Sequence, residues 1–400
     1  MRSDKNTFMI NKRPVLIWGA GRRTISSLRI NPDIRPQYII DSDLNKTGNM
    51  AGIDIVHPGD IHNWKDFYVI INVKNKGDEI ENLLTGYGLK EKTDFCYMDE
   101  FIISSPRMAD IQKLLMSICF ENKNEAELKC CVNNKQEYLA LREKSKFLKY
   151  EEYLGRYYNN RIFRLGTYEG YCACCKRTRM MRVSYDYSTR MTPYWRETLI
   201  CPVCKMNSRM RFAIEYLGAF TDKKIYIQEQ VTPFFKNLKK IIPDLTGSEF
   251  LGSNYAGGDL VNGVLHEDAE ALSFDDNIFD VVGSFDVFEH IDNYTMGMKE
   301  ARRCLKPGGV FLLSVPVFKS RYNHVRRSGL SQSGTINHCL EPQYHCNPLS
   351  EKGSLVFHEF GWKLIDDLKE AGFREVRAIV YSSIDKGYLG ELPVIFEAIK

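Results

Sequence analysis

Apolar runs of strand length alternate with turns and helical stretches at both ends of this 400-residue chain. Near the N-terminus, apolar runs at residues 15–18 and 67–71 flank a third run at residues 38–41, which ends in an aspartate. Their spacing is that of successive βαβ units, in which a helix returns the chain to the next parallel strand. We therefore predict a small parallel α/β module over residues 1–106.

The pattern becomes helical over residues 107–165, where apolar residues recur three or four positions apart among many Lys and Glu. This spacing places one apolar stripe along a helix. The stripe consists of Leu114, Leu115, Ile118, Leu139, Leu141 and Leu148. We predict a helical connector that packs on one or both neighbours, with a partly ordered linker as the alternative.

Strands and helices alternate again over residues 213–400. The expected strands are 224–228, 247–251, 264–268, 279–286, 306–316 and 392–398, and the expected helices are 233–241, 296–305 and 362–371. This alternation predicts a parallel, doubly wound sheet, a fold whose ligands bind at the carboxyl ends of the strands. The predicted fold class is α/β with several domains.

Composition and charge narrow the classes of protein that remain. Hydrophobic residues make up 44% of the chain and charged residues 26%, as in a folded globular protein. The net charge of +4 is small for this length, so the chain as a whole is not a polyanion binder. Residues 1–11 lack the apolar core of a signal peptide, and no apolar run approaches the roughly 20 residues that cross a bilayer. We expect a cytoplasmic protein with no transmembrane segment.

Five of the 12 cysteines fall within residues 172–204, which indicates metal binding in a reducing compartment. Cys172 and Cys175 form one C-x2-C pair, and Cys201 and Cys204 form a second. Two such turns supply the four thiolates of a tetrahedral zinc site, with an iron–sulfur cluster as the alternative. Cys174 competes with Cys175 as a ligand, although the two-residue spacing favours Cys175. A four-thiolate site has no open position, so the expected zinc ribbon at 166–212 is structural.

The expected zinc module is also basic. Nine basic residues lie within residues 170–211, namely Lys176, Arg177, Arg179, Arg182, Arg190, Arg196, Lys205, Arg209 and Arg211. Only Asp186 and Glu197 oppose them, and four aromatic residues (Tyr185, Tyr187, Tyr194 and Trp195) are interleaved. This pattern fits either a solvated basic face or a surface that binds an anionic partner such as a nucleic acid.

Three ordered motifs in the C-terminal half carry a family resemblance. They are Leu-Ser-Phe-Asp-Asp-Asn-Ile-Phe-Asp at 272–280, Phe-Glu-His-Ile at 288–291 and Leu-Lys-Pro-Gly-Gly at 305–309. Together they resemble the class I S-adenosylmethionine-dependent methyltransferases of the type 11 group. The resemblance covers about 180 residues and implies a methyltransferase domain over residues 213–400.

The resemblance also implies a set of cofactor-binding residues. Glu249, at the end of the second strand, would hold the nucleoside diol, and Asp268 would take the adenine amino group, with Ala269 beside it. Ser284 and Phe285 would line the methionine end. The family's glycine-rich turn after the first strand is absent, and Gln228 and Glu229 stand there instead, where their side chains could contact the amino and carboxyl groups of the cofactor.

A hydroxyl acceptor needs a base with a pKa near neutrality, for which histidine is the natural candidate. His290 follows the fourth strand, on the side that faces the donor in this fold. The stretch 317–357 is too long for a simple connector, and we call it the lid region. Within it, residues 337–345, which carry His338 and His345, are predicted to form a lid over the substrate. We predict these three as catalytic candidates, each with the alternative of a structural or surface histidine.

The N-terminal module begins with Trp-Gly-Ala-Gly-Arg at residues 18–22, followed by Asp41. It resembles the Rossmann-like modules attached to bacterial sugar-modifying glycosyltransferases and methyltransferases. The third glycine of the nucleotide-binding pattern is replaced by Thr24, so the signal for a nucleotide is weak. We favour a scaffold or a dimerisation domain, which would make the chain a homo-oligomer, over a nucleotide site.

The function implied by these resemblances is S-adenosylmethionine-dependent O-methylation of a sugar or polysaccharide precursor, a small-molecule or glycan substrate. One alternative is an RNA methyltransferase that holds nucleic acid on the basic zinc module. The other is a cofactor-binding scaffold without catalysis.

Overall fold

The computed structural model describes residues 9–10, 12–22, 24–25, 28, 35–73, 77–91, 93–98, 106–160, 166–188 and 193–400. The chain divides into two compact units. The first comprises Met1–Leu114, Leu154–Glu169 and Arg179–Tyr194, and the second comprises Leu115–Tyr153, Gly170–Thr178 and Trp195–Lys400. The predicted α/β class is confirmed. Among the described residues no helix is long and apolar enough to span a membrane.

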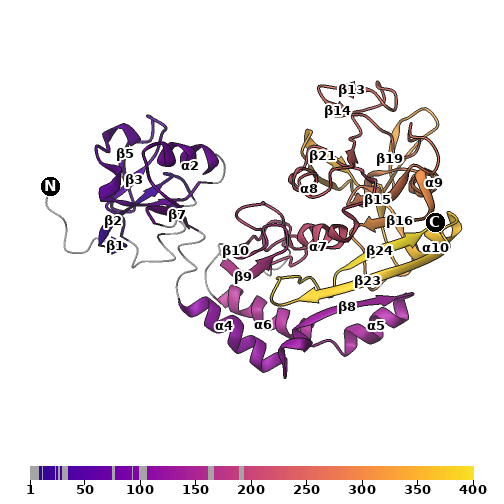
Figure 1. Ribbon diagram of the computed structural model, residues 1–400, viewed down its shortest axis with the longest axis horizontal. Coiled ribbons are helices and arrows are strands. Elements are labelled where there is room, and N and C mark those ends of the chain that lie inside the picture. The colour runs from indigo at the N-terminus through magenta and orange to yellow at the C-terminus, as the bar shows by residue number, and fades with distance from the viewer. Residues whose placement is uncertain are drawn as a thin grey trace. The chain divides into compact units, whose positions relative to one another are not determined.

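The first unit is built on a sheet with the strand order β4-β5-β3-β2-β6-β7 (Figure 1). Its strands are β1 (Met9–Ile10), β2 (Arg13–Trp18), β3 (Tyr38–Ile40), β4 (Gly48–Met50), β5 (Ile53–Val56), β6 (Tyr68–Ile71) and β7 (Phe95–Tyr97), and helix α2 is Gly77–Gly86. β2 pairs in parallel with both β3 and β6. Four residues of β2 and all four of β6 are buried, as the continuous apolar runs predict for a parallel sheet.

The glycine turn of the first unit allows the backbone at Gly19 to pack closely against the backbone at Asn72. Gly19 has a φ of +123°, and a Cβ at this position would lie 2.7 Å from the carbonyl oxygen of Asn72. The Asp41 carboxylate accepts hydrogen bonds from the amides of Ala20 (2.7 Å) and Asp43 (3.0 Å), and Lys46 lies 3.0 Å away. A carboxylate engaged in this way supports a scaffold role for the module, which stays a prediction.

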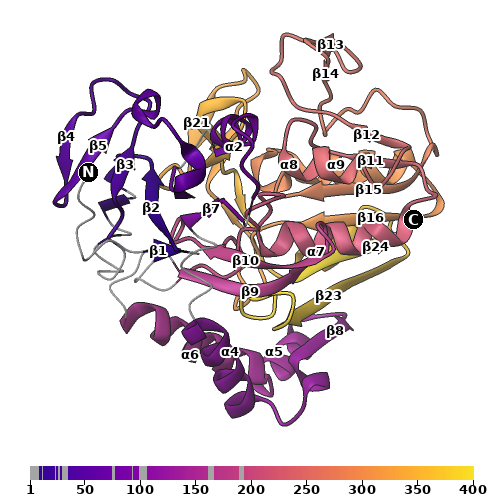
Figure 2. The same cartoon turned by 60° about the vertical axis from the view of Figure 1, so that its left-hand side comes forward.

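The second unit is organised around a seven-stranded sheet with the order β12-β11-β15-β16-β24-β23-β8 (Figure 2). The strands are β11 (Ile225–Ile227), β12 (Leu245–Gly247), β15 (Phe279–Phe285), β16 (Leu305–Ser314), β23 (Glu375–Ser383), β24 (Val394–Ile399) and β8 (Glu127–Val132). The first four are parallel, β24 is antiparallel to β16, and β23 is antiparallel to β24. The predicted doubly wound sheet is therefore present, with an antiparallel end.

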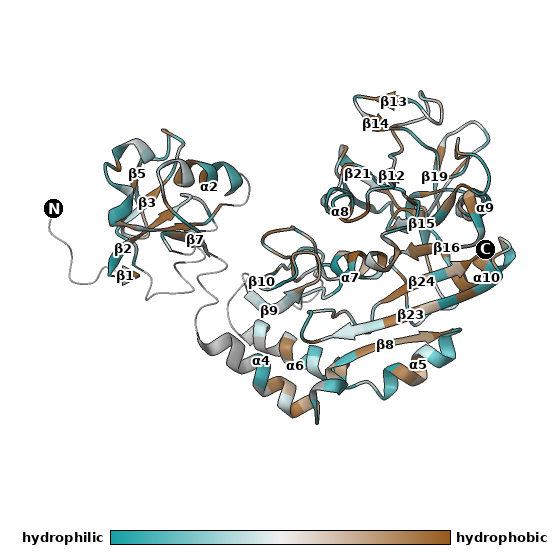
Figure 3. Ribbon diagram, in the orientation of Figure 1, coloured by the Kyte–Doolittle hydropathy of each residue, from teal (hydrophilic) through white to brown (hydrophobic). Residues whose placement is uncertain are grey.

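Helices cover both faces of this sheet. They are α7 (Ser208–Leu217), α8 (Pro233–Leu238), α9 (Tyr294–Cys304) and α10 (Leu364–Glu370). In Figure 1, α7 and α8 lie on one side of the sheet and α9 and α10 on the other. Hydrophobic residues concentrate in strands such as β8 and β16, whereas α5 (Lys135–Glu143) is largely polar (Figure 3).

The prediction of a full third strand over residues 264–268 is wrong. Val264–Leu265 instead forms β14 of a two-stranded antiparallel sheet with β13 (Leu260–Val261). Only one parallel bridge, between Glu249 and His266, continues the main sheet beyond β12. The short antiparallel sheet forms in place of a third parallel strand because the turn at Asn262 (φ 52°) and Gly263 (φ 80°) reverses the chain locally.

Short antiparallel pairs fill the predicted lid region. Their strands are β17 (Val325–Arg326), β18 (Ser328–Leu330), β19 (Ile336–His338), β20 (Tyr344–Asn347), β21 (Ser350–Leu355) and β22 (His358–Glu359). They pair as β17 with β22, β18 with β19, and β20 with β21.

The predicted connector contains a strand as well as helices. Its helices are α4 (Pro106–Cys119), α5 and α6 (Lys146–Asn160), with β8 between α4 and α5. β8 pairs antiparallel with β23 over six residues of each strand. The sequence of β8, Glu-Leu-Lys-Cys-Cys-Val, does not reveal this pairing, because the partner strand follows about 250 residues later.

Candidate functional site

The carboxyl ends of β11 and β15 carry two buried polar side chains that face no protein partner. Gln228 and Ser284 directly follow a paired register position, and the backbone amide of Gln228 donates to the carbonyl of Gly283 at 3.0 Å, so that only the side-chain amide is left to consider. Gln228 is 7% exposed and Ser284 is fully buried. Within the described part of the chain, neither the Gln228 amide group nor the Ser284 hydroxyl has a hydrogen-bond partner. Buried polar groups without partners are costly, so this pair fits a bound polar ligand.

The turn after β11 is held by a carboxylate rather than by glycines. Oε1 of Glu249 accepts hydrogen bonds from the amides of Gln230 (2.7 Å) and Val231 (2.9 Å). The close approach that needs a glycine falls on β12, because a Cβ at Gly247 would lie 2.6 Å from the carbonyl oxygen of Glu229. The Glu249 carboxylate thus holds the turn that glycines form in the resembled family. One of its oxygens, Oε1, is already used by the two backbone amides.

The remaining predicted cofactor residues surround the same strand ends. Asp268 and Ala269 follow the single bridge at His266, and Oδ1 of Asp268 accepts from the Glu270 amide at 2.9 Å. Phe285 ends β15 and packs on Phe234, with ring centroids 4.8 Å apart. These positions follow the carboxyl ends of neighbouring strands, where an open α/β sheet binds its ligand.

Glu229 is the most perturbed carboxylate of this group. It is 8% exposed, and burial raises its pKa to about 7. The Thr232 hydroxyl donates to it and Arg209 favours its charged form, but both effects are smaller than the effect of burial. Near neutral pH this side chain can therefore switch between an acceptor-only anion and a neutral acid.

A buried ion-pair network stands at the end of β15, which the sequence did not reveal. Asp286 has a φ of 57° and binds both Arg196 (Nη2 to Oδ1, 2.7 Å) and Arg209 (Nη2 to Oδ2, 3.0 Å). Glu197 pairs with the same two arginines. Burial alone would raise the pKa of Asp286, but the two guanidinium groups hold it well below its usual range. The network fixes the segment that leads to residues 288–291.

The basic face expected for the zinc module is smaller than predicted. Arg196 and Arg209 are neutralised by Asp286 as well as Glu197, and Arg211 is fully buried with its guanidinium bonded to carbonyl oxygens of Lys386 and Leu199. Arg190 lies outside the described residues. The sequence misled because the opposing carboxylate comes from a strand about 80 residues away.

Two of the three predicted catalytic histidines come together. His290 follows β15 and His345 lies on β20, and their ring centroids are 5.1 Å apart and perpendicular. Oε1 of Glu289 lies 3.8 Å from Nε2 of His290 and 3.5 Å from Nδ1 of His345. His338 is exposed on β19, where its Nδ1 lies 2.9 Å from the Ser328 hydroxyl. Glu289 was missed as a site residue, although it stands inside the 288–291 motif.

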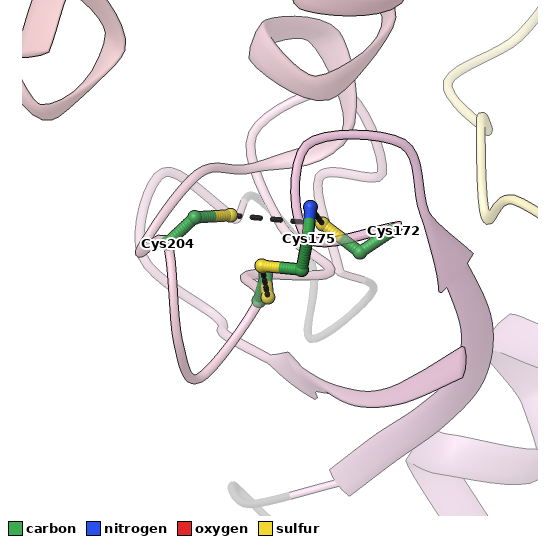
Figure 4. Close-up of side chains that lie close together, drawn as sticks. Cys172, Cys175 and Cys204 are labelled. Atoms are coloured by element: carbon green, nitrogen blue, oxygen red, sulfur yellow. Dashed lines mark hydrogen bonds between the residues drawn. The ribbon is translucent and has the colours of Figure 1, made fainter. Parts of the chain in front are cut away.

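The four predicted knuckle cysteines converge on one point, and Figure 4 labels three of them, Cys172, Cys175 and Cys204. All four sulfur atoms lie within 4.8 Å of one another, and the group includes Cys175 rather than Cys174. Cys172 and Cys204 are 3.7 Å apart, and Cys175 and Cys201 are 3.8 Å apart. These separations are too long for disulfides. They match the roughly 3.8 Å between sulfurs around a tetrahedral ion with bonds of about 2.3 Å.

The two cysteine turns have the same local conformation. The residue after the second cysteine of each pair, Lys176 (φ 52°) and Lys205 (φ 62°), is left-handed. The second turn is further closed by a hydrogen bond from the Lys205 amide to the Cys201 carbonyl at 3.0 Å. The side-chain amide of Asn237, on α8, donates to the Cys204 carbonyl at 3.4 Å. The knuckle is thus attached to the first helix after β11.

Comparisons with known proteins agree with the fold. A family model described as a methyltransferase domain matches residues 248–313. A search of the curated proteins finds no significant relative of this chain.

Among solved structures, an S-adenosylmethionine-dependent methyltransferase from Thermotoga maritima is 17% identical, with a TM-score of 0.28, over 47% of this chain and 92% of its own. One from Mesorhizobium loti is 14% identical, with a TM-score of 0.28, over 44% and 91%. DesVI from Streptomyces venezuelae is 13% identical, with a TM-score of 0.31, over 48% and 92%. Similarities this distant carry no argument by themselves.

The assignment rests on the family match together with the doubly wound sheet and its carboxyl-end site. The matched residues run from the end of β12 to β16 and include the strand β15 that carries Ser284. The unpartnered polar groups of Gln228 and Ser284 fit a polar cofactor at that place. Residues 248–313 thus match the methyltransferase domain family, and this part of the chain is a methyltransferase domain of the S-adenosylmethionine-dependent kind.

Proposed function

We propose that this enzyme transfers a methyl group from S-adenosylmethionine to a hydroxyl group of a sugar or polysaccharide precursor. The observation that carries the hydroxyl acceptor is the cluster of Glu289, His290 and His345 just beyond the carboxyl end of β15. A hydroxyl must lose its proton during transfer, and such a cluster can promote that loss. An acceptor without an ionisable proton would need no such group.

The donor site is proposed at the strand ends already described. Gln228 and Glu229 would bind the amino and carboxyl groups of the cofactor, and Glu249 its ribose hydroxyls. Asp268 and Ala269 would contact the adenine, while Ser284 and Phe285 would line the methionine end. The buried, unpartnered amide of Gln228 and hydroxyl of Ser284 support this arrangement. The cofactor supplies the activated methyl group, and these side chains position it.

Two exposed tyrosines in the lid region support a sugar as the acceptor. Tyr322 and Tyr344 are 47% and 53% exposed in the lid region. Exposed rings of this kind can pack on the apolar face of a sugar ring, while neighbouring amide groups such as that of Gln343 bond its hydroxyls. The resemblance of the N-terminal module to those of sugar-modifying enzymes points the same way. The cytoplasmic location and the homo-oligomer stay predictions.

Zinc is proposed at Cys172, Cys175, Cys201 and Cys204, as a structural ion. The four sulfurs have tetrahedral spacing and leave no position for a substrate. The ion would hold the two turns together, and the second turn lies in sequence between the two arginines that bind Asp286. It would therefore support the wall of the active site without taking part in transfer.

An RNA substrate is less well supported. Three of the nine basic residues predicted to form the binding surface point inward, as described above. Exposed basic residues remain at Lys176, Arg177 and Lys205, with Arg179 and Arg182 half-buried. So small a set of cations gives only weak, salt-sensitive attraction to a phosphate backbone.

An acceptor screen with labelled donor tests the proposed substrate class. Nucleotide sugars, oligosaccharides and ribosomal RNA would be incubated with the full chain, and transfer of label would be measured. We expect label on a sugar hydroxyl. Label on RNA would contradict the sugar assignment, whether or not an Arg177→Ala variant still labels it. Transfer to no acceptor would favour the scaffold alternative.

A Glu229→Gln variant is expected to be more stable but to bind the donor less tightly. Because burial raises the pKa of Glu229 from 4.5 to about 7, the folded chain holds this proton more tightly than the unfolded chain. The carboxylate therefore lowers the free energy of unfolding progressively as the pH rises from about 4.5 to 7, by up to about 3 kcal/mol. Denaturant unfolding at pH 5 and pH 8 measures this loss, which the variant should lack.

Calorimetry on the same variant measures the donor affinity. Loss of the charge that pairs with the cofactor ammonium should weaken binding by about tenfold or more. Asp222→Asn, at a largely exposed carboxylate, serves as the matched control for charge. A variant with unchanged donor affinity would remove Glu229 from the proposed site.

A further inference from the structure

Glu289 is buried without any hydrogen bond to satisfy it. The residue is 1% exposed, and neither carboxylate oxygen has a hydrogen-bond partner in the described part of the chain. Its carbonyl is engaged, since the Phe357 amide donates to it at 2.8 Å, so the residue is held in place by its backbone. A buried carboxylate with no donors is expensive unless a cation faces it.

The two histidines that approach Glu289 have the orientation of ligands. Nδ1 of His290 lies 2.8 Å from the carbonyl oxygen of Leu355, which can only accept, so Nδ1 carries the proton. This leaves Nε2, which lies 3.8 Å from Oε1 of Glu289, with a lone pair that can bind an ion. A histidine that donates its other ring nitrogen to a backbone carbonyl is the usual arrangement around a metal ion. His345 presents its Nδ1 to the same carboxylate oxygen, at 3.5 Å.

The spacing of these three groups suits one ion. One ring nitrogen of His290, one of His345 and a carboxylate oxygen of Glu289 all lie within 4.8 Å of one another. An ion with bonds of about 2.1 Å separates its ligand atoms by roughly 3 to 3.5 Å. The observed 3.8 Å and 3.5 Å from the Glu289 oxygen to the two rings require only small side-chain movements.

We propose that Glu289, His290 and His345 bind a divalent first-row transition metal ion, separate from the ion of the cysteine knuckle. Two imidazoles and one carboxylate are the donor set of metal sites that keep open coordination positions. The histidine rings are 17% and 31% exposed, so the open side can be reached from outside, whereas the carboxylate is enclosed.

The role of this ion rests on the proposed function. An acceptor hydroxyl bound at an open position would have its pKa lowered by the ion. Its proton would pass to solvent water, its oxygen would bond to the methyl carbon, and the methyl–sulfur bond of the donor would break to leave S-adenosylhomocysteine. In this form of the mechanism the two histidines are ligands rather than bases.

Binding of Mn2+ to the full, zinc-loaded chain tests the site without donor or acceptor. Mn2+ favours oxygen and nitrogen ligands, so a closed thiolate knuckle will not compete for it. Calorimetry and the spin-resonance signal of free Mn2+ should show one saturable site per chain. Glu289→Gln, which keeps the shape of the side chain, and His345→Ala should each weaken it by more than about tenfold.

His338→Ala is the matched control, because this lid histidine is exposed and contacts Ser328 rather than Glu289. It should leave Mn2+ binding unchanged, and zinc content should stay constant in all three variants. Absence of saturable Mn2+ binding by the wild-type chain, or equal binding by Glu289→Gln with an unaltered melting temperature, would overturn the proposal. Since no acceptor is present, failure to methylate sugars would leave this result unaffected.

Discussion

Replacement of Cys201 by serine is expected to abolish zinc binding and to lower the melting temperature of the second unit by about 10 °C or more. Cys201 is fully buried, and its backbone closes the second knuckle turn through hydrogen bonds with Lys205 and Met206. Structural zinc contributes about 10 kcal/mol or more to small domains that depend on it. Even half of that loss shifts a melting temperature of a domain this size by roughly 10 to 20 °C.

The effect should extend from the knuckle to the donor site. Arg196 and Arg209 stand on either side of the second turn in sequence and together hold Asp286. Loosening of the turn therefore frees the residues that fix the end of β15. Elemental analysis, calorimetric melting and donor titration measure the three consequences.

Cys131→Ser is the control, because Cys131 is exposed on β8 and is not part of the four-sulfur group. It should keep one zinc per chain and the wild-type melting temperature. A Cys201→Ser chain that also keeps a full equivalent of zinc would contradict the knuckle assignment.

An Asp286→Asn variant is expected to lose about 3 to 5 kcal/mol of the free energy of unfolding at pH 7. The substitution leaves two largely buried guanidinium groups, of Arg196 and Arg209, with one carboxylate fewer. Removing one partner of a buried ion pair costs this much because the remaining charge is uncompensated. Asparagine tolerates the left-handed conformation at this position, so the change isolates the charge.

The loss should depend on pH in a defined direction. The arginines hold the pKa of Asp286 well below its usual range, despite burial that raises it. The stability contributed by this carboxylate is therefore present above the pKa of the unfolded chain, about 3.9, and declines as the pH falls below it. Denaturant unfolding at pH 7 and pH 3 should show a smaller difference between wild type and variant at pH 3.

Glu375→Gln is the control, since this carboxylate pairs with Arg374 and both side chains are more than half exposed. Exposed pairs contribute about 0 to 1 kcal/mol. If Asp286→Asn costs no more than this control, the network has no part in the stability of the site.

Much of the architecture could be predicted from the chain because the evidence was local. The apolar runs at residues 279–286 and 306–316 became β15 and β16, and the two C-x2-C turns became one four-sulfur group. Strand length, buried strand pattern and ligand spacing are all properties of neighbouring residues.

What was missed depends on contacts between distant residues. Asp286 neutralises arginines about 80 residues earlier, and His345 reaches Glu289 from a hairpin about 55 residues later. The turn after β11 lacks glycine because Glu249 satisfies its amides. None of these pairings leaves a periodic mark in the sequence, so only the folded chain reveals them.

Strand β8 begins the sheet of the second unit well upstream of residues 248–313, which match the methyltransferase family. It covers the edge of β23 through six paired residues, and Tyr138 and Glu151 bond the backbone of Gly390, Glu391 and Leu392. A shortened enzyme that starts at residue 213 would lack β8 and would expose the edge of β23 that β8 covers. Unpaired backbone groups on such an edge promote aggregation with other copies of the chain. The methyltransferase sheet is thus completed by a segment that sequence motifs assign to a different part of the protein, and any division of this chain for separate study has to fall before Glu127.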